Sequence, residues 1–267
     1  MDVSLAHFLQ QVLSNPALTV TTLLTLGVIF VNGWTDAPNA IATCIATRCI
    51  NVRAAILTSA VFNFLGVLIM THINSSVAST ISNMVDFGGN THEALIALCA
   101  ALFSIVVYSV GASYFGIPTS ESHSLIAGLT GAAIALQGSF DAINGAEWMK
   151  VVYGILLSTL LGFGLGWINY KVIGRMCRNV DRLKANSFFK WAQICSGAGV
   201  AFMHGAQDGQ KFMSIFMLAI MMTAGMGMDL SGVAMPMWLM IFCAFNMGLG
   251  TAVGGERIIK SVGMDMV

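Results

Sequence analysis

The sequence predicts an all-α membrane protein, a polytopic helical bundle that contains two broken helices. Hydrophobic residues make up 57% of the 267 residues and charged residues only 9%, whereas about a quarter of the residues in a soluble domain are charged. Uncharged runs such as 94–120 and 151–170 reach the roughly twenty residues with which a helix crosses a bilayer. Two further apolar segments each contain one aspartate among glycine and amide residues, at 32–40 and 204–211, which indicates a break in the helix.

Seven membrane-spanning segments follow from the apolar runs, and residues 1–16 are expected to form a short interfacial segment ahead of them. The first and sixth segments are too long for one straight span, so each is expected to consist of two half-helices joined by an unwound piece. In chain order the segments are 17–47 (broken at 32–38), 54–71, 94–113, 119–137, 149–170, 191–222 (broken at 204–211) and 234–254.

The positive charges predict that the N-terminus lies outside, because Lys and Arg concentrate in cytoplasmic loops. Ten of the twelve Lys and Arg residues are then cytoplasmic, and the exceptions are Lys150 at an outer helix end and Lys211 in the second broken segment. We therefore expect a multi-pass protein of the cell membrane, surrounded by lipid bilayer. The ten cytoplasmic residues are Arg48 and Arg53, six in the basic loop 171–190 (Lys171, Arg175, Arg178, Arg182, Lys184 and Lys190), and Arg257 and Lys260.

Several classes of protein are disfavoured by the composition and motifs. The six cysteines form no Cys-x-x-Cys pair, so neither a zinc site nor a disulfide framework is indicated. A formal net charge of zero gives no basic field that would attract nucleic acid. The sequence also lacks the His-Glu-x-x-His and Gly-x-Ser-x-Gly patterns of hydrolases. We expect no enzyme, no bound cofactor and no nucleic-acid partner.

The two interrupted segments are candidates for an ion or anion site. A lone carboxylate inside a membrane span is costly and usually functional. The N-terminal end of a half-helix favours an anion, and its C-terminal end with a carboxylate suits a small hard cation. Oxygen ligands of this kind come from Asp36 with Asn39 and from Asp208 with Gln207.

A third polar cluster, at residues 116–124, opens an otherwise apolar segment with hydroxyls, a carboxylate and an imidazole. Ser120 and Ser122 can donate hydrogen bonds to the oxygens of an oxyanion. The alternative is an ordinary helix N-cap, with Thr119 or Ser120 as the capping residue and Glu121 or Ser122 in the first turn.

These three motifs resemble those of the PiT inorganic phosphate transporters. That family repeats the signature Gly-Ala-Asn-Asp-x-x-Asn-Ala, and each half also carries a Pro-x-Ser-Thr-Thr-His element. Residues 33–40 resemble the first signature, with Thr35 in place of Asn, and residues 205–211 resemble the second, with Gln207 in that place. Residues 118–123 resemble the hydroxyl element, with Glu and Ser in place of two threonines, and the resemblance covers nearly the whole chain.

The resemblance implies cation-coupled secondary transport of inorganic phosphate, with Na⁺ or H⁺ as the co-transported ion, an inverted-repeat fold and a homodimer. It also implies that the aspartate motifs and the hydroxyl element meet near the middle of the bilayer. The sodium ligands expected from it are Thr35, Asp36, Asn39, Gln207 and Asp208. The expected phosphate contacts are Asp36, Asn39, Thr119, Ser120, Glu121, Ser122, Gln207, Asp208 and Lys211.

On this interpretation the second repeat lacks its end. Pro118 lies 82 residues after Asp36, and the same offset from Asp208 passes Val267, so a second hydroxyl element is not expected. The predicted parts are a first repeat at 1–150 with motifs at 32–40 and 116–124, a fifth span with the basic cytoplasmic loop at 151–190, and a partial second repeat at 191–267 with its motif at 204–211.

Two charged residues leave alternatives open. Lys211 follows Asp208 by three residues, so the two can pair on one helix face. Lys211 is then either a static partner or a fixed charge that replaces one mobile cation or neutralises phosphate. Glu121 either stabilises the first turn of its helix through the helix dipole or carries a coupling proton.

Two alternative functions also remain. Sulfate or another tetrahedral oxyanion could be the substrate, because hydroxyls, backbone amides and a helix dipole bind these anions as well as phosphate. An intramembrane hydrolase, using Asp36 and Asp208 as an aspartyl dyad, belongs to a different class. The amides beside both aspartates are better ion ligands than catalytic partners, which favours transport.

Overall fold

The computed structural model describes residues 4–73, 84, 85, 87, 90–225, 235–253 and 259. Within this part the regular elements are helices, which confirms the prediction of an all-α protein, and one isolated bridge pairs Val85 with Ile143. In chain order the elements are α1 (Leu5–Ser14), α2 (Pro16–Ala46), α3 (Val52–Ile73), α5 (Thr91–Phe115), α6 (Glu121–Gln137), the short 3₁₀ helix η1 (Phe140–Ala142), α7 (Gly145–Met176), α8 (Arg182–Thr223) and α9 (Met237–Val253).

Each of the seven predicted segments coincides largely with one of these helices, and the predicted interfacial segment contains α1. Four of the described helices are long and apolar enough to cross a membrane, namely α2, α3, α5 and α7. The apolar helix α9 is shorter, with 17 residues, and α8 carries the polar second motif along its length. The described part of the chain is therefore an integral membrane protein.

Local sequence signals set the helix boundaries. Asn15 caps α2 by accepting hydrogen bonds from two backbone N–H groups of the first turn, and Asn144 does the same for α7. Gly116 after α5 and Gly138 after α6 have φ angles of 71° and 68°. This left-handed conformation ends a helix and is adopted most easily by glycine.

The prediction of two broken helices is wrong. One continuous α-helix of 31 residues runs through the first motif, with Pro38 inside it. A second continuous helix, of 42 residues, runs through the second motif. Membrane helices tolerate proline and glycine where neighbouring helices and side chains compensate for the weakened backbone, so residues that break a helix in water do not break these two.

The motif glycines that suggested a break are instead points of close contact between helices. A Cβ atom on Gly33 would overlap the backbone carbonyl oxygen of Met247 on α9, and one on Gly205 would overlap the carbonyl oxygen of Asn63 on α3. Small residues at such positions allow helix backbones to approach each other. The same two interfaces contain Gly250 against Phe30 and Gly66 against Phe202.

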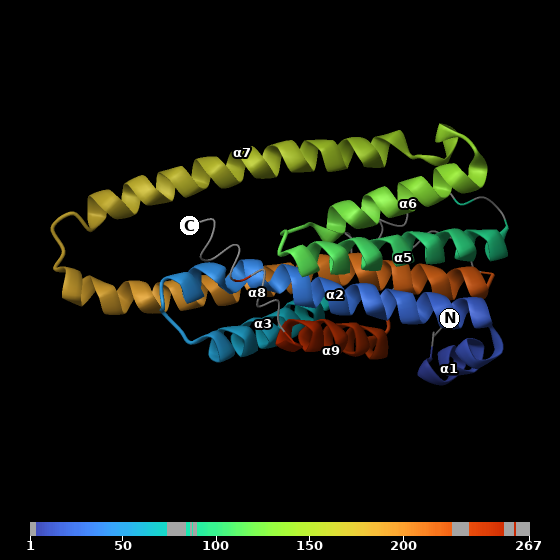
Figure 1. The fold of residues 1–267 in the computed structure, drawn as a ribbon, viewed down its shortest axis with the longest axis horizontal. Coiled ribbons are helices and arrows are strands. Elements are labelled where there is room, and N and C mark those ends of the chain that lie inside the picture. Colours follow the sequence, from blue (N-terminus) through green and yellow to red (C-terminus); the bar gives the residue numbers. More distant parts are fainter. Residues whose placement is uncertain are drawn as a thin grey trace.

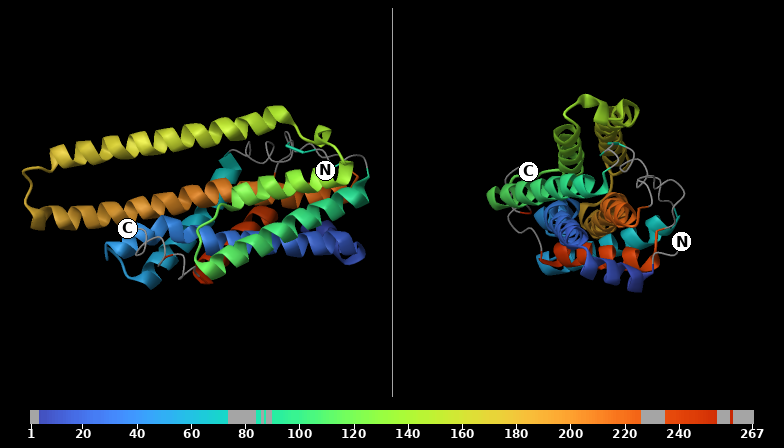
Figure 2. Two further views of the ribbon diagram at one scale, coloured as in Figure 1. Left: turned by 45° about the horizontal axis from the view of Figure 1, so that its top comes forward. Right: turned by 90° about the vertical axis from the view of Figure 1, so that its right-hand side faces the viewer.

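The two motif helices, α2 and α8, lie side by side at the centre of the bundle (Figures 1 and 2). On one side, α3 and α9 pack against these two helices. On the other side, α5 packs against α2, and α6 packs against α5. All residues at 212–222 of α8 are buried. The α5–α6 connection ends partway along α2 (Figure 1), so the start of α6 lies beside the middle of the bundle.

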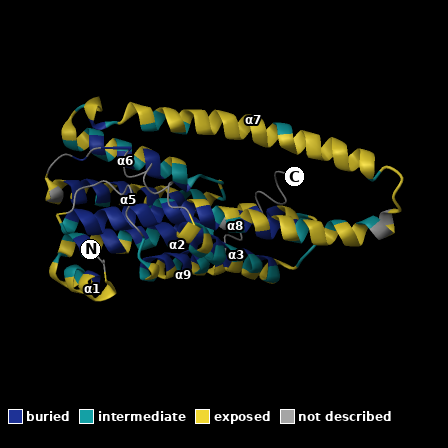
Figure 3. Ribbon diagram, turned by 180° about the vertical axis from the view of Figure 1, so that it is seen from behind, coloured by how far each residue is buried: buried dark blue, intermediate teal, exposed yellow. Residues whose placement is uncertain are grey.

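The helix α7 stands away from the bundle and has no buried residue (Figure 3). Its first turns contact α6, where Trp148 Nε1 lies 3.2 Å from Thr130 Oγ1. An exposed helix that is apolar on all sides is typical of one surrounded by lipid.

The predicted basic loop 171–190 is largely helical, so that prediction is wrong for all but residues 177–181. The loop is replaced by the end of α7 and the start of α8, which continue well beyond the rest of the bundle (Figure 1). This connection and the α2–α3 turn lie toward the same end of the molecule (Figure 1), and both carry the positive charges used to predict the orientation. Arg257 and Lys260 lie outside the described residues.

The close glycine contacts predict that Gly205→Ala destabilises the protein by about 1–3 kcal/mol, the usual range for overpacking. The added methyl group has to separate α8 from α3. Gly199→Ala on the same helix is the matched control, because a Cβ there meets no atom within 4 Å, and alanine favours a helix over glycine. Unfolding of the purified protein in detergent measures both changes, and equal stability of the two variants would contradict the contact.

Candidate functional site

The two aspartates of the predicted motifs meet inside the bundle. Asn32, one helical turn before Asp36, is fully buried. Its Nδ2 atom lies 3.2 Å from Asp36 Oδ2 on the same helix and 3.1 Å from Asp208 Oδ2 on α8. A single side-chain amide therefore donates to both carboxylates and holds them on either side of itself.

His204 faces the same pair of carboxylates from α8. Its Nε2 atom lies 3.6 Å from Asp208 Oδ2 and 3.9 Å from Asp36 Oδ2. Its Nδ1 atom lies 2.8 Å from Asn63 Oδ1. Asn63 Nδ2 lies 3.1 Å from the Thr251 hydroxyl. This bond orients the Asn63 amide so that its oxygen faces the imidazole.

The orientation of Asn63 assigns the hydrogen on the ring of His204. A carbonyl oxygen only accepts hydrogen bonds, so Nδ1 carries the hydrogen that is donated to Asn63. In the neutral ring Nε2 then has a lone pair, and this lone pair faces Asp36 and Asp208.

Lys211 is a direct partner of Asp208. Its Nζ atom lies 2.6 Å from Asp208 Oδ1 and 2.6 Å from Ser122 Oγ. Ser122 Oγ in turn lies 3.3 Å from Asp208 Oδ1 and donates to it. The predicted pairing of Lys211 with Asp208 is confirmed, and Ser122 connects this ion pair to the start of α6.

The first residue of α6, Glu121, contacts the first motif helix. Glu121 is fully buried, and its Oε1 atom lies 2.6 Å from the hydroxyl of Thr35. The same hydroxyl lies 2.8 Å from the Val31 carbonyl oxygen. Consecutive residues at the N-terminus of α6 thus contact both motif helices, Glu121 on α2 and Ser122 on α8.

Some buried polar atoms of the site lack a hydrogen-bond partner. Three buried acceptors have no hydrogen bond within the described part of the chain: Asn32 Oδ1, His204 Nε2 and Glu121 Oε2. One ligand atom from each of Asp36, His204 and Asp208 lies within 4.8 Å of the other two. Since buried acceptors need a donor or a cation, this arrangement is suited to bind a cation.

The structure does not bring every predicted site residue to the carboxylates. Asn39 and Gln207 are exposed. Ser120 caps α6 by accepting a hydrogen bond from the backbone N–H of His123 at 3.4 Å, which confirms the capping interpretation for this residue. Thr119 is half-buried in the connection that precedes it.

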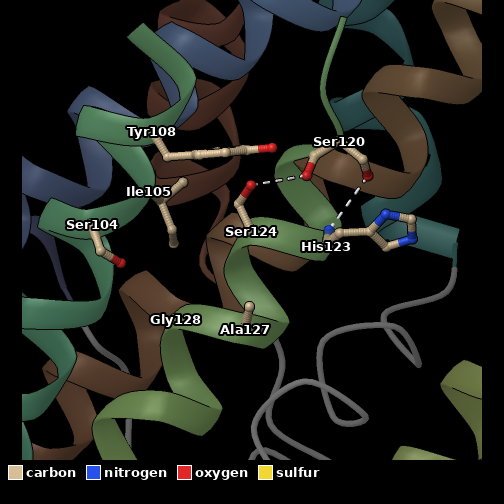
Figure 4. Close-up of a pocket in the computed structure, with 8 residues that line it drawn as sticks. All are labelled: Ser104, Ile105, Tyr108, Ser120, His123, Ser124, Ala127 and Gly128. Atoms are coloured by element: carbon tan, nitrogen blue, oxygen red, sulfur yellow. Dashed lines mark hydrogen bonds between the residues drawn. The ribbon is translucent and has the colours of Figure 1, made fainter. Parts of the chain in front are cut away.

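Ser120 and its neighbours line a separate pocket of about 480 Å³ between α5 and α6 (Figure 4). Figure 4 shows the Ser124 hydroxyl directed at the backbone oxygen of Ser120, 3.1 Å away. The pocket residues and the pair Glu121–Ser122 belong to different faces of α6. The pocket is lined by Ser104, Ile105, Tyr108, Ser120, His123, Ser124, Ala127 and Gly128.

Three residues of the site were not assigned a role from the sequence: Asn32, Asn63 and His204. A signal for two of them is present, because Asn32 precedes Asp36 by four residues and His204 precedes Asp208 by four. Residues four apart lie on the same helix face. For Asn63, on another helix, the sequence gives no such signal.

A helical membrane bundle that buries aspartate, histidine and lysine side chains together defines a membrane transport protein, since ionisable residues within a membrane mark ion or substrate pathways. The chain belongs to the phosphate transporter family, whose sequence pattern matches residues 32–186 and 177–267. The resemblance seen in the motifs is thus confirmed over nearly the whole chain.

Two curated relatives illustrate the membership. A probable low-affinity inorganic phosphate transporter of Bacillus subtilis (strain 168) is 36% identical over 234 residues, which cover 88% of this chain and 68% of the relative. A protein of Mycobacterium bovis with the same description is 32% identical over 250 residues, covering 94% of this chain and 58% of the relative. The relatives are described as transporters, as the sequence predicts, and not as enzymes.

A solved structure described as the sodium-dependent phosphate transporter has the same fold. It superposes with a TM-score of 0.81 at 21% sequence identity, covering 93% of this chain and 78% of the other. At this identity the comparison concerns the fold alone.

The shared amide predicts that Asn32→Ala lowers the free energy of unfolding by about 1.5–3 kcal/mol, the usual contribution of a hydrogen bond to a charged group. Both carboxylates lose a donor in this variant. Asn169→Ala is the control, because Asn169 donates to a backbone oxygen on the exposed face of α7. Unfolding in detergent compares the two, and an equal, small effect would show that Asn32 does not hold the pair.

Proposed function

We propose that this chain carries out, within its family, the sodium-coupled transport of inorganic phosphate. The observation that carries the proposal is the pair Asp36–Asp208 inside the bundle, close to the His204 ring, in a site where several buried polar atoms lack a hydrogen-bond partner. The names of the relatives supply the substrate, phosphate.

Sodium is the coupling ion that fits these ligands best. A proton satisfies one acceptor atom, whereas a metal cation is coordinated by several at once. One oxygen of each aspartate and a ring nitrogen of His204 lie within 4.8 Å of one another and offer such a set. The structurally similar protein is described as sodium-dependent, which agrees with this choice over a proton.

Phosphate is proposed to bind at the start of α6, next to Lys211. The first backbone N–H groups of a helix and its dipole favour an anion, and Ser122 and Lys211 add a hydroxyl and an ammonium group. The other predicted contacts, Asn39, Thr119, Ser120 and Gln207, remain proposals.

The larger organisation is also a proposal. The chain spans 68% and 58% of the length of the two relatives described above. We propose the division into a first repeat at 1–150, a connecting span at 151–190 and a partial second repeat at 191–267. The matching glycine contacts of α2 with α9 and of α8 with α3 support such an inverted repeat. The homodimer is proposed from the family resemblance.

The uptake of labelled phosphate into proteoliposomes tests the function. We expect an inward sodium gradient to drive uptake by the purified chain, and Asp36→Asn to lower the sodium-driven rate at least tenfold, because a cation ligand loses its charge. Asp141→Asn, at an exposed carboxylate in η1, is the control and should leave uptake unchanged.

The same assay separates the alternatives. Uptake that follows a pH gradient and ignores sodium would assign the coupling to protons. Competition by equimolar sulfate would identify a general oxyanion transporter. The absence of uptake under both gradients would refute transport by this chain.

We further propose that the α7–α8 connection is cytoplasmic, as the basic residues around it predict. In a variant whose only cysteine is Cys177, in this connection, a membrane-impermeant maleimide should label broken but not intact cells. A variant whose only cysteine is Phe140→Cys, at an exposed position on the connection to the other end of α7, should show the opposite result. Labelling of Cys177 in intact cells would reverse the orientation.

A further inference from the structure

The two aspartates of the site differ in whether a lysine side chain pairs with them. Lys211 Nζ lies 2.6 Å from Asp208 Oδ1, and the two side chains are 19% and 9% exposed. Among the ion pairs of the described residues, no Lys or Arg reaches Asp36, whose nearest basic atom is His204 Nε2 at 3.9 Å. One carboxylate thus has a permanent positive partner, and the other does not.

This difference occurs at corresponding positions of the two motif helices. Lys211 stands three residues after Asp208, and Asn39 stands three residues after Asp36. Asn39 is neutral and exposed, whereas Lys211 is turned toward its aspartate. The positive charge is therefore present in one motif only.

We propose that the Lys211 ammonium is a built-in cation that takes the place of one mobile cation at Asp208. The site then binds one sodium ion fewer than two equivalent aspartate motifs would bind. The remaining sodium ion binds on the side of Asp36, within reach of the His204 ring. This inference rests on the sodium site proposed above.

The contacts of Lys211 explain how a tethered cation serves the transport cycle. Ser122 accepts from the ammonium and donates to Asp208, so the charge is held between the carboxylate and the start of α6. A tethered cation stays with the protein when the substrate leaves. Each phosphate is therefore accompanied by one positive charge fewer than with a mobile ion at Asp208.

A purely structural ion pair between α8 and α6 makes a different prediction. Such a pair holds the helices together and has no effect on the number of ions that the protein binds. The number of bound sodium ions, and not activity alone, separates the two interpretations.

The experiment measures radioactive sodium bound per purified chain by equilibrium dialysis in detergent, with phosphate absent. We expect Lys211→Asn, which introduces the residue found at the corresponding position of α2, to bind one sodium ion more than the parent chain. Lys211→Arg keeps the fixed charge and should retain the parental number. The same number of sodium ions in Lys211→Asn and in the parent would overturn the proposal.

Lys150→Asn is the matched control for the loss of a lysine. Lys150 also pairs with a carboxylate three residues away, Glu147, at 2.6 Å, but its side chain is 63% exposed. This variant should bind the parental number of sodium ions. The double variant Lys211→Asn with Asp208→Asn removes both charges and should also return to the parental number.

If Lys211→Asn is unstable, the effect of sodium on its melting temperature provides the test instead. The proposal predicts that added sodium raises the melting temperature of Lys211→Asn more than that of the parent or the double variant. A variant that stays unfolded in high sodium while the double variant folds would show that sodium does not replace the ammonium, and would overturn the proposal.

These measurements do not need transport. A difference of one sodium ion without phosphate uptake would support the built-in cation while refuting the proposed function. Sodium-driven uptake with equal sodium binding would do the reverse.

Discussion

The structure depends on two carboxylates that lie next to each other inside a membrane bundle. Ligand atoms of Asp36 and Asp208 lie within 4.8 Å of each other, and two negative charges at that distance repel by roughly 3 kcal/mol even at an effective dielectric constant of 20. The bridging amide of Asn32 and the ammonium of Lys211 offset this repulsion. Asn32 and Lys211 thus lie where they help to keep these two charges together.

The packing of the helices makes this arrangement possible. Aspartate and asparagine have short side chains, so they can meet across α2 and α8 only where the backbones are held close and in fixed positions. Gly33 and Gly205, adjacent to the site, provide the close contacts with α9 and α3. The Gly205 contact lies at Asn63, which also orients His204. The glycines therefore position the polar site as well as the helices.

Much of this fold could be predicted from the sequence, because apolar length and charge decide where a chain crosses a membrane. Each of the seven segments coincides largely with a helix of the described residues, and the two aspartates meet. The helix breaks were predicted wrongly, because an aspartate among glycine and amide residues and a segment too long for one straight span are also compatible with one long continuous helix, as in α2 and α8. The hydrogen bond between Asn63 and His204 could not be predicted, because it joins helices far apart in the sequence. That Ser120 and Ser122 lie on different faces of α6 could not be predicted either, because it depends on the residue at which this helix begins.

The two aspartate motifs are similar in sequence, but the helices that surround them differ. The face of α2 that contains Val28 and Val31 is covered, with exposures of 0% and 5%, whereas Val200 and Met203, at the corresponding positions of α8, are 51% and 47% exposed. The polar partners are also unequal, since α6 reaches Thr35 through its first residue and Asp208 through its second. In the proposed function, the anion at the start of α6 and the cation at the aspartates are linked through Ser122 and Lys211, which both contact Asp208. Two sites linked in this way affect each other's affinity reciprocally, which is the physical requirement for coupled transport.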